Sequence, residues 1–270
     1  MKKNINNMDE HQLAVHKRKK KNSWIIFGVF VFIRIFFIEH FAVPSSSMTP
    51  TLITGDIILI KKHAYSWSRL SIPLGGFLPF KNGIVLNKPK RGDIAVFVLD
   101  RDPSTYYVKR IVALEGDWVQ MKNGVLHVNK QPVKFEFVKN FTFRNDEGKT
   151  ETGGEFRITM PFENNREYTV YRNEQIGMGH IDNTLEFKVP QGHVWVQGDF
   201  HTGSADSFSP HFMGPIPMNR LVGKPFFVLY GTNSRIAQEP NWTKWIMQLP
   251  WRVLVAFKET NFKRFFISVK

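Results

Sequence analysis

A long apolar segment near the N-terminus constrains this chain more than any other feature. The fifteen residues from Trp24 to Ile38 carry a single charge, Arg34, and follow a run of five basic residues at 17–21. The segment 24–43 has the length that crosses a bilayer as a helix. Basic residues are held on the cytoplasmic side of such helices. We therefore expect one transmembrane helix over 24–43, a basic cytoplasmic tail at 1–23, and all later residues outside.

Two other interpretations of this segment were weighed. A removable secretory signal usually has a shorter apolar core and ends at small residues, whereas this segment ends in Glu-His-Phe-Ala-Val at 39–43. A buried helix of a soluble domain would not explain the basic run before it. We expect the segment to be retained, with Arg34 near the outer end, where its side chain can extend toward lipid headgroups.

Positive charge is concentrated at the two ends of the chain. The formal net charge is +14, with 37 Lys and Arg against 23 Asp and Glu, and much of the excess lies in 1–23 and 241–270. No zinc-finger spacing and no RNA-binding aromatic signature accompanies it, which argues against a nucleic-acid partner. The segment 241–270 mixes aromatic with basic residues, a composition typical of a membrane interface and equally of an amphipathic cap on a domain.

The chain contains no cysteine, which excludes disulfides, thiolate metal sites and a cysteine nucleophile. Its nine histidines lack metal-ligand spacing, and neither a phosphate-binding loop nor a G-x-S-x-G motif occurs. We therefore expect no metal and no organic cofactor. Covalent catalysis would need a nucleophile other than cysteine.

Short β-branched and aromatic runs follow residue 44, separated by Gly, Pro, Asn and Asp. Almost none has a helical period, so we expect this part to be mainly β. The more polar stretch 120–191 is interpreted as a β-rich subdomain inserted between the two parts of a β core, 44–119 and 192–240. The runs that we predict as strands are 56–61, 93–98, 106–114, 118–121, 125–128, 194–196 and 221–229.

Two segments contain residues that could carry chemistry. Residues 44–52, Pro-Ser-Ser-Ser-Met-Thr-Pro-Thr-Leu, place three serines after the apolar segment, which alone is typical of a polar linker. Residues 107–117 place Lys109 within a strand of core-forming residues, on the same face as Tyr107 and opposite to Arg110. A surface lysine or one half of a buried ion pair is the ordinary interpretation of Lys109.

A buried lysine offers another possibility, because burial disfavours its charged form and lowers its pKa. The neutral amine can then take the proton from a serine hydroxyl. A lysine pKa starts near 10.4, so a value of about 8 requires roughly 3 kcal/mol of differential destabilisation of the ammonium. An apolar strand face can supply that amount.

These segments resemble the motifs of bacterial type I signal peptidases, also called leader peptidases. The nucleophile motif P-S-x-S-M-x-P-T-L is matched at 44–52 and the lysine motif Y-[IV]-K-R-[IV]-x-x-x-x-G-D at 107–117. Two intermediate motifs are matched at 55–59 and 91–97. The last motif, G-D-N-R-D-N-S-x-D-S-R, is matched in part at 198–208, where Phe-His-Thr-Gly replaces N-R-D-N and Phe replaces the final Arg.

The resemblance implies a signal-peptidase-like β core that carries a Ser/Lys serine protease. Ser47 would attack the scissile carbonyl, and Lys109 would be the general base. The hydroxyl of Ser45 and the backbone N–H of Ser47 would form the oxyanion hole. Ser204 would hydrogen-bond the lysine amine and orient it.

Three charged residues are implied as supports of this site. Asp199 and Asp206 would hold the turn of the last motif as partners of backbone or basic groups. Because Phe208 stands where the family has arginine, the carboxylate of Asp206 needs either Arg110 or backbone donors as partners.

The resemblance also implies the substrate, the signal peptides of exported preproteins, which the family cleaves after small residues at −1 and −3. An extended peptide on a sheet edge presents alternate side chains to one face. Catalysis would occur at the outer face of the bacterial plasma membrane, in contact with lipid. The pockets would be lined by Phe41, Val43, Met48, Leu52, Ile58, Val96, Tyr107 and Val108.

Three alternatives were kept beside this interpretation. A Ser/Lys relative dedicated to one plasmid-transfer or pilus precursor usually has a shorter insertion. A membrane-anchored binding protein with an inactive protease core is favoured only by the altered last motif. A Ser-His-Asp hydrolase built on His193, His201 or His211 lacks a nucleophile motif beside any histidine.

Overall fold

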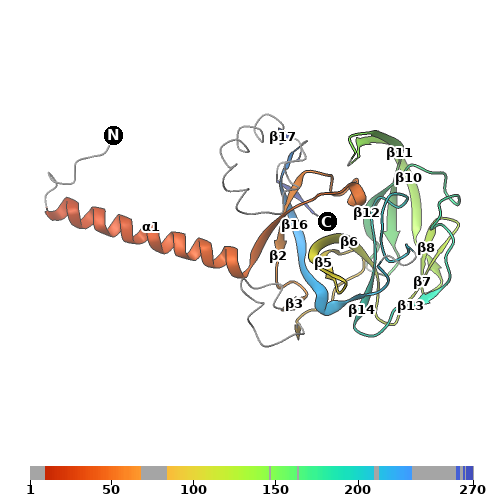
Figure 1. Cartoon of the computed structure of the whole chain (residues 1–270), viewed down its shortest axis with the longest axis horizontal. Coiled ribbons are helices and arrows are strands. Elements are labelled where there is room, and N and C mark those ends of the chain that lie inside the picture. The colour runs from red at the N-terminus through yellow and green to blue at the C-terminus, as the bar shows by residue number, and fades with distance from the viewer. Residues whose placement is uncertain are drawn as a thin grey trace.

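The structure is a computed structural model in which one long helix leads into a β domain (Figure 1). It describes residues 10–67, 84–145, 147–162, 164–209, 213–232, 260–261, 264 and 266–269. Most of the C-terminal segment expected at 241–270 and also His211 lie outside the described residues.

Helix α1 runs over Glu10–Phe36, so it starts within the predicted tail and ends before the predicted membrane segment does. Strand β1, Ile38–Ala42, follows it and pairs antiparallel with β2, Asp56–Lys61. The predicted helix is therefore confirmed over 24–36 and wrong over 37–43, because β2 rather than a further helical turn satisfies the backbone of β1. Over the described ranges, no helix has the length and apolarity that crossing a membrane requires.

The main sheet of the described chain has nine strands, six of which lie within the core ranges expected from the sequence, whereas β1, β17 and β18 lie outside them. Its order is β1-β2-β16-β5-β6-β14-β15, and the two short strands β17 and β18 also pair with β16. All seven predicted strand runs are strands, with ends that shift by a few residues. The remaining bounds in this sheet are β5 Ile94–Leu99, β6 Asp102–Leu114, β14 His193–Gln197, β15 Ile216–Pro217, β16 Leu221–Thr232, β17 Thr260–Asn261 and β18 Ile267–Ser268.

The other described strands form three smaller sheets, two of them largely within the range expected for the insertion. A three-stranded antiparallel sheet has the order β10-β11-β12, a four-stranded sheet the order β13-β7-β8-β9, and β3 pairs with β4. Their bounds are β3 Ser66–Trp67, β4 Ile84–Val85, β7 Trp118–Lys122, β8 Val125–Val128, β9 Gln131–Pro132, β10 Lys134–Arg144, β11 Thr150–Met160, β12 Arg166–Arg172 and β13 Phe187–Lys188.

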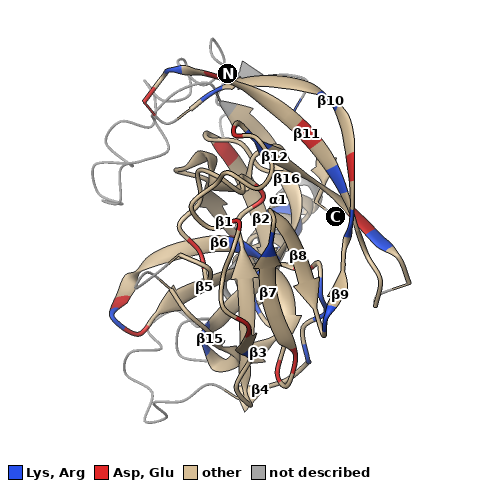
Figure 2. Cartoon of the chain, turned by 90° about the vertical axis from the view of Figure 1, so that its right-hand side faces the viewer, with Lys and Arg blue, Asp and Glu red and all other residues tan. Residues whose placement is uncertain are grey.

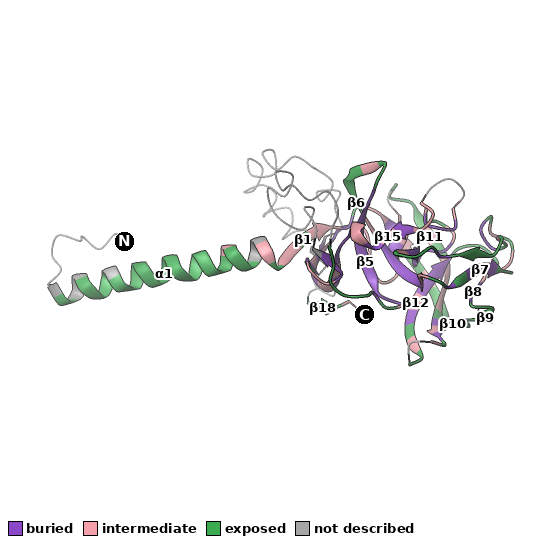
Figure 3. Ribbon diagram, turned by 90° about the horizontal axis from the view of Figure 1, so that it is seen from below, coloured by how far each residue is buried: buried purple, intermediate pink, exposed green. Residues whose placement is uncertain are grey.

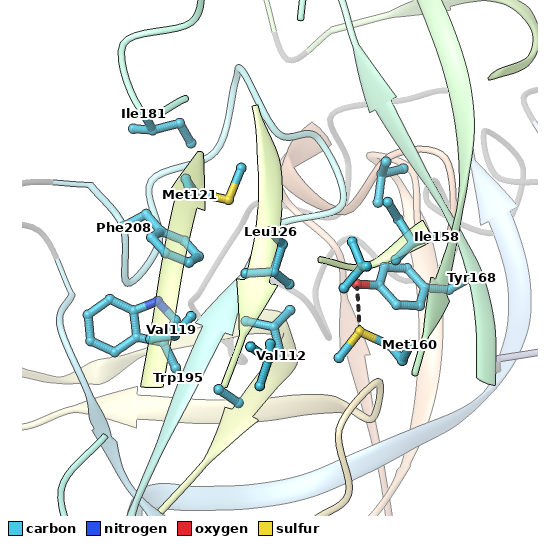
Figure 4. Packing of buried hydrophobic residues seen from close by; sticks show 14 of the residues in the cluster. Val112, Val119, Met121, Leu126, Ile158, Met160, Tyr168, Ile181, Trp195 and Phe208 are labelled. Carbon is cyan, nitrogen blue, oxygen red and sulfur yellow. Dashed lines mark hydrogen bonds between the residues drawn. The ribbon is translucent and has the colours of Figure 1, made fainter. Parts of the chain in front are cut away.

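A hydrophobic cluster joins the three-stranded and the four-stranded sheet to the main one. Val112 of β6 and Trp195 of β14 pack in it with Met121 of β7, Leu126 of β8 and Met160 of β11 (Figure 4). Burial of such side chains stabilises a fold by roughly 1.5–3 kcal/mol each. The insertion is therefore packed onto the main sheet rather than tethered beside it.

Strand β5 lies in the centre of the domain and is buried on both faces. Val96 packs in a cluster with Met48, whereas its neighbours Ala95 and Phe97 pack in a second cluster on the other face. Figure 3 shows the contrast between this buried interior and α1, which is mostly exposed. Strand β6, which carries Lys109, thus pairs with a strand that is buried on both faces.

The exposed strands of the insertion carry charges of both signs. Figure 2 shows Lys and Arg interspersed with Asp and Glu along β10 and β11. Ion pairs on this surface join Lys139 to Glu155 at 3.5 Å and Arg157 to Glu167 at 3.8 Å. Exposed pairs of this kind contribute at most about 1 kcal/mol each to stability. Their main effect is to keep this surface soluble.

Candidate active site

Ser47 lies on a single turn of 3₁₀ helix, Ser46–Met48, shortly after strand β1. Its neighbours Ser46 and Met48 are buried, whereas Ser47 itself is half-buried. Met48 anchors the turn, because its side chain packs in a buried apolar cluster. This arrangement fixes the backbone of the turn while leaving the serine hydroxyl accessible to a substrate.

Lys109 lies on β6 and is paired in register with Ala95 of β5. Its side chain is only 4% exposed, and its Nζ lies 2.5 Å from Oγ of Ser47. The two residues are 62 positions apart in the chain, so the sheet brings them together. A half-buried hydroxyl in contact with a buried amine is the arrangement that a Ser/Lys acyl-transfer reaction requires.

Ser45 provides a second hydroxyl beside the nucleophile. Its Oγ lies 3.2 Å from Oγ of Ser47, and its backbone is extended, at φ −136° and ψ 155°. The hydroxyl is therefore within reach of an oxygen bound to a carbon that Ser47 attacks, the geometry that an oxyanion donor needs.

Ser204 does not make the hydrogen bond to Lys109 that the family resemblance implies. Its side chain is buried, and its Oγ has no hydrogen-bond partner within the described structure. The hydroxyl packs instead against the backbone of Gly198, where an added Cβ would lie 2.0 Å from Ser204 Oγ and 2.6 Å from the carbonyl oxygen of Ser47. Gly198 is thus the close contact that lets the last motif approach the nucleophile turn.

Asp199 forms a buried ion pair beside the segment that carries Ser47. Its carboxylate accepts hydrogen bonds from Nε and Nη2 of Arg110, at 2.8 and 2.7 Å, and both side chains are 1% exposed. Thr51, in the nucleophile motif, donates its hydroxyl to the same carboxylate at 2.5 Å. Asp199 therefore ties strand β6, which carries Lys109, to the segment that carries Ser47.

Arg110 points away from the lysine beside it, as strand alternation predicts. Its Nη1 donates to the carbonyl oxygen of Gly92 at 2.7 Å, and its guanidinium lies 4.2 Å from the ring centroid of Tyr168 in β12. A buried arginine needs such partners because an unpaired buried charge is very costly. The sequence analysis missed Thr51 and Tyr168. Thr51 could have been noticed because it lies in the motif at 44–52, whereas nothing around Tyr168 indicated its contact with Arg110.

Backbone donors satisfy Asp206, the second of the two possibilities left by the loss of the motif arginine. Its carboxylate accepts the N–H of Gly198 at 3.1 Å and that of Phe208 at 2.9 Å. Burial raises the pKa of Asp206 to about 6, although these hydrogen bonds and the charge of Lys109 oppose the rise. No described arginine forms an ion pair with this carboxylate.

We expect the Asp206→Asn variant to gain stability relative to the native chain as pH rises from about 4 to about 7. A carboxyl whose folded pKa is raised from 3.8 to about 6 favours the fold below the unfolded pKa, and that contribution is lost as pH rises through 6. Two units correspond to about 3 kcal/mol. Urea unfolding of both proteins across this pH range measures the change.

The control for this prediction is Asp182→Asn. Burial alone would raise the pKa of Asp182, but its ion pair with Arg172 and the backbone N–H groups of Gly177 and Gly179 together outweigh burial and lower it. The Asp182→Asn variant should therefore lose stability relative to the native chain as pH rises. A pH-independent difference for Asp206→Asn would contradict the raised pKa.

The structure brings seven of the eight expected pocket residues into one cluster and places Tyr107 in another. The ring of Tyr107 stacks on Phe97, with centroids 6.0 Å apart, and its hydroxyl donates to Asp102. Its position on the opposite side of β5 follows from alternation along β6. The seven residues that cluster together are Phe41, Val43, Met48, Leu52, Ile58, Val96 and Val108.

The described histidines are not arranged as a serine–histidine pair. His201 is buried against Phe135, with ring centroids 6.3 Å apart, and burial lowers its pKa to about 3. Nδ1 of His193 lies 2.8 Å from the carbonyl oxygen of Gln191. In the described part of the chain, no three His, Asp or Glu side chains are grouped as metal ligands.

Comparison with known proteins relates this chain to one family. The profile described as "Signal peptidase, peptidase S26" matches residues 18–230. Signal peptidase I of Rickettsia massiliae (strain Mtu5) is 34% identical over 224 residues, which cover 78% of this chain and 80% of that protein. Signal peptidase I of Rickettsia typhi (strain ATCC VR-144 / Wilmington) is 33% identical over 74% of this chain and 75% of that protein.

A solved structure is also similar in part. The crystal structure of a signal peptidase I from Enterococcus faecalis V583 is 20% identical, covers 52% of this chain and 97% of that one, and has a TM-score of 0.29. The assignment rests on the family profile and the curated relatives, which extend over most of the chain. This chain belongs to the signal peptidase I family of serine endopeptidases, peptidase family S26.

Proposed function

We propose that this chain cleaves signal peptides from exported preproteins with Ser47 as nucleophile and Lys109 as general base. The observation that carries the proposal is the 2.5 Å contact between Nζ of the buried Lys109 and Oγ of the half-buried Ser47. Family membership supports the reaction class, the removal of signal peptides by a serine protease.

The reaction follows the usual course of acyl transfer. The neutral Nζ of Lys109 accepts the hydroxyl proton while Oγ of Ser47 attacks the scissile carbonyl carbon. The oxyanion is stabilised by the hydroxyl of Ser45 and the backbone N–H of Ser47. The intermediate collapses, the C–N bond breaks, and Lys109 returns the proton to the leaving amine. Water, activated by the same amine, then hydrolyses the ester and releases the signal peptide.

We infer that small residues are selected at −1 and −3 by the cluster of seven apolar residues around Met48. Five members of that cluster, including Val43 and Leu52, are at most 3% exposed, so they are already closely packed against one another. Alternate residues of an extended substrate would face this surface. Small side chains fit such a shallow apolar wall without displacing it.

We further infer that the enzyme works against a membrane surface through α1. Trp24, Ile26 and Phe30 are each more than 60% exposed, and they follow exposed basic residues at 18–21. Exposed aromatic and aliphatic side chains next to basic ones favour binding to anionic lipid. Because β1 follows the helix directly, such contact would place Ser47 near the lipid.

The test uses the purified full chain and a preprotein with alanine at −1 and −3, with and without anionic lipid vesicles. We expect cleavage at the bond after residue −1, and faster cleavage with vesicles. A matched preprotein with leucine at −1 should be cleaved about a hundredfold more slowly. Equal rates for the two preproteins would contradict the proposed specificity. Equal rates with and without vesicles would contradict the inferred membrane contact.

A further inference from the structure

The part of the last motif that departs from the family lies between the nucleophile and the insertion. The backbone N–H of Phe200 donates to the carbonyl oxygen of Ser47 at 3.0 Å. On its other side, Phe200 forms an isolated parallel bridge with Tyr171 of β12. The backbone N–H of Tyr171 donates to the carbonyl oxygen of Asp199 at 2.8 Å, and the carbonyl oxygen of Tyr171 accepts the N–H of His201 at 3.0 Å. The backbone at Phe200 is thus held between β12 and the nucleophile turn.

Three aromatic rings fix this connection, and we call Phe143, Tyr171 and Phe200 the aromatic cluster. The ring of Phe200 lies 5.0 Å from that of Tyr171 and 5.7 Å from that of Phe143, and the latter two lie 5.0 Å apart. Their planes cross at 69° to 89°, which is the favourable edge-to-face arrangement. Each ring therefore holds the other two.

The glycine that replaces asparagine in the motif belongs to the same arrangement. A Cβ on Gly203 would lie 2.3 Å from the ring of Phe200, closer than any real contact. The backbone at 203 therefore passes directly over that ring, which only glycine allows. Two of the five departures from the family pattern in this motif are physically coupled through this contact.

We propose that the aromatic cluster positions the nucleophile, so that Phe143 and Tyr171 of the insertion and Phe200 are positioning residues for the cleavage reaction. This inference rests on the proposed role of Ser47. Ser47 stands on a turn of only three residues, whose N-cap Ser45 supplies no side-chain capping hydrogen bond. The hydrogen bond from the N–H of Phe200 to the Ser47 carbonyl therefore orients the turn from outside, in addition to the packing of Met48.

The cluster acts on the reaction rather than on substrate binding. Tyr171 is fully buried and Phe200 is 5% exposed, so neither ring is available to a peptide. Without the rings, the N–H of Phe200 is no longer held against the Ser47 carbonyl, and Oγ departs from its contact with Lys109. A displacement of about 1 Å of a reacting group can cost a hundredfold in rate. The expected signature is a lower kcat with an unchanged KM.

The experiment compares ring removal with ring retention in preprotein cleavage by the full chain. We expect Phe200→Leu and Tyr171→Leu each to lower kcat between about tenfold and a hundredfold, with KM unchanged. Tyr171→Phe should retain the native kcat, since the tyrosine hydroxyl has no hydrogen-bond partner within the described structure. The double leucine variant should lose little more than either single one, because both remove the same support.

Phe137→Leu is the matched control, because Phe137 lies on the same strand as Phe143, is 59% exposed and packs on Phe156. It should leave kcat unchanged. Should Phe200→Leu fail to fold, Phe143→Leu replaces it, since Phe143 is only half-buried. Native kcat in folded leucine variants, or an equal loss in Phe137→Leu, overturns the inference. An active Ser47→Ala variant would instead overturn the proposed function.

Discussion

Replacing Lys109 with methionine should reduce preprotein cleavage by at least about 10⁴-fold while leaving the protein folded. Methionine keeps an unbranched apolar side chain in a site where lysine is 4% exposed, but it has no amine to accept the proton of Ser47. Without its base, a serine hydroxyl is a poor nucleophile. Groups that act as one catalytic unit lose nearly the full rate enhancement when a single member is removed.

The same reasoning predicts that Ser47→Ala is as inactive as Lys109→Met and that the double variant is no worse than either. Single-turnover cleavage of a preprotein, with thermal unfolding of each variant as a check on folding, measures both statements. Lys88→Met is the matched control, because Lys88 is exposed and pairs with Glu115 on the surface. An active Lys109→Met variant together with an inactive His201→Phe variant would favour a histidine mechanism.

The parts of the site that the sequence predicts well are those encoded in short segments. Ser47 and Lys109 each lie in a run whose order of residues is specific, and strand alternation alone separates Lys109 from Arg110. The strands were predictable for a similar reason, because β-branched and aromatic runs bounded by Gly, Asp and Asn carry their own signal. No tertiary information was needed for either.

The N-terminal helix shows where composition is ambiguous. The residues from Trp24 to Ala42 are nearly all apolar or aromatic, and this composition suits a buried strand as well as a helix. The choice is made by β2, which lies 14 residues further on and pairs with Ile38–Ala42. A local reading of hydrophobicity could not include that partner, so it extended the helix too far.

The contacts across the last motif were the least predictable. The sequence indicates that Asp206 lacks its motif arginine. It does not indicate that the Ser204 side chain and the Ser47 carbonyl both pack against Gly198, or that the Ser204 hydroxyl has no hydrogen-bond partner in the described structure. Likewise the substitution at Phe200 looks like a loss of the family pattern until Tyr171 and Phe143 are brought beside it. Long-range contacts of this kind carry no signal within their own segments.

The other large effect is expected for Asp199→Ala, which should lower the free energy of unfolding by about 3–5 kcal/mol. The guanidinium of Arg110 is 1% exposed and donates two hydrogen bonds to this carboxylate. Removing the carboxylate leaves a buried positive charge without its counterion, which costs far more than an intact pair contributes. Urea unfolding monitored by tryptophan fluorescence measures the loss.

An exposed pair of the same chemistry provides the control. Asp100 pairs with Arg220 but its side chain is 61% exposed, so Asp100→Ala should change stability by no more than about 0.5 kcal/mol. Equal midpoints of unfolding for Asp199→Ala and the native chain would show that Arg110 finds another partner. That result would contradict the central role given to this ion pair.

The double variant Arg110→Met/Asp199→Leu separates stability from positioning. Apolar side chains of similar volume can replace a buried ion pair with little or no loss of stability, so most of the 3–5 kcal/mol should return. Cleavage should not return with it, because the hydroxyl of Thr51 loses the carboxylate that anchors the nucleophile segment to the strand of the base. A double variant that recovers both stability and rate would reduce Asp199 to a purely structural residue, whereas recovery of stability alone assigns it to the alignment of Ser47 with Lys109.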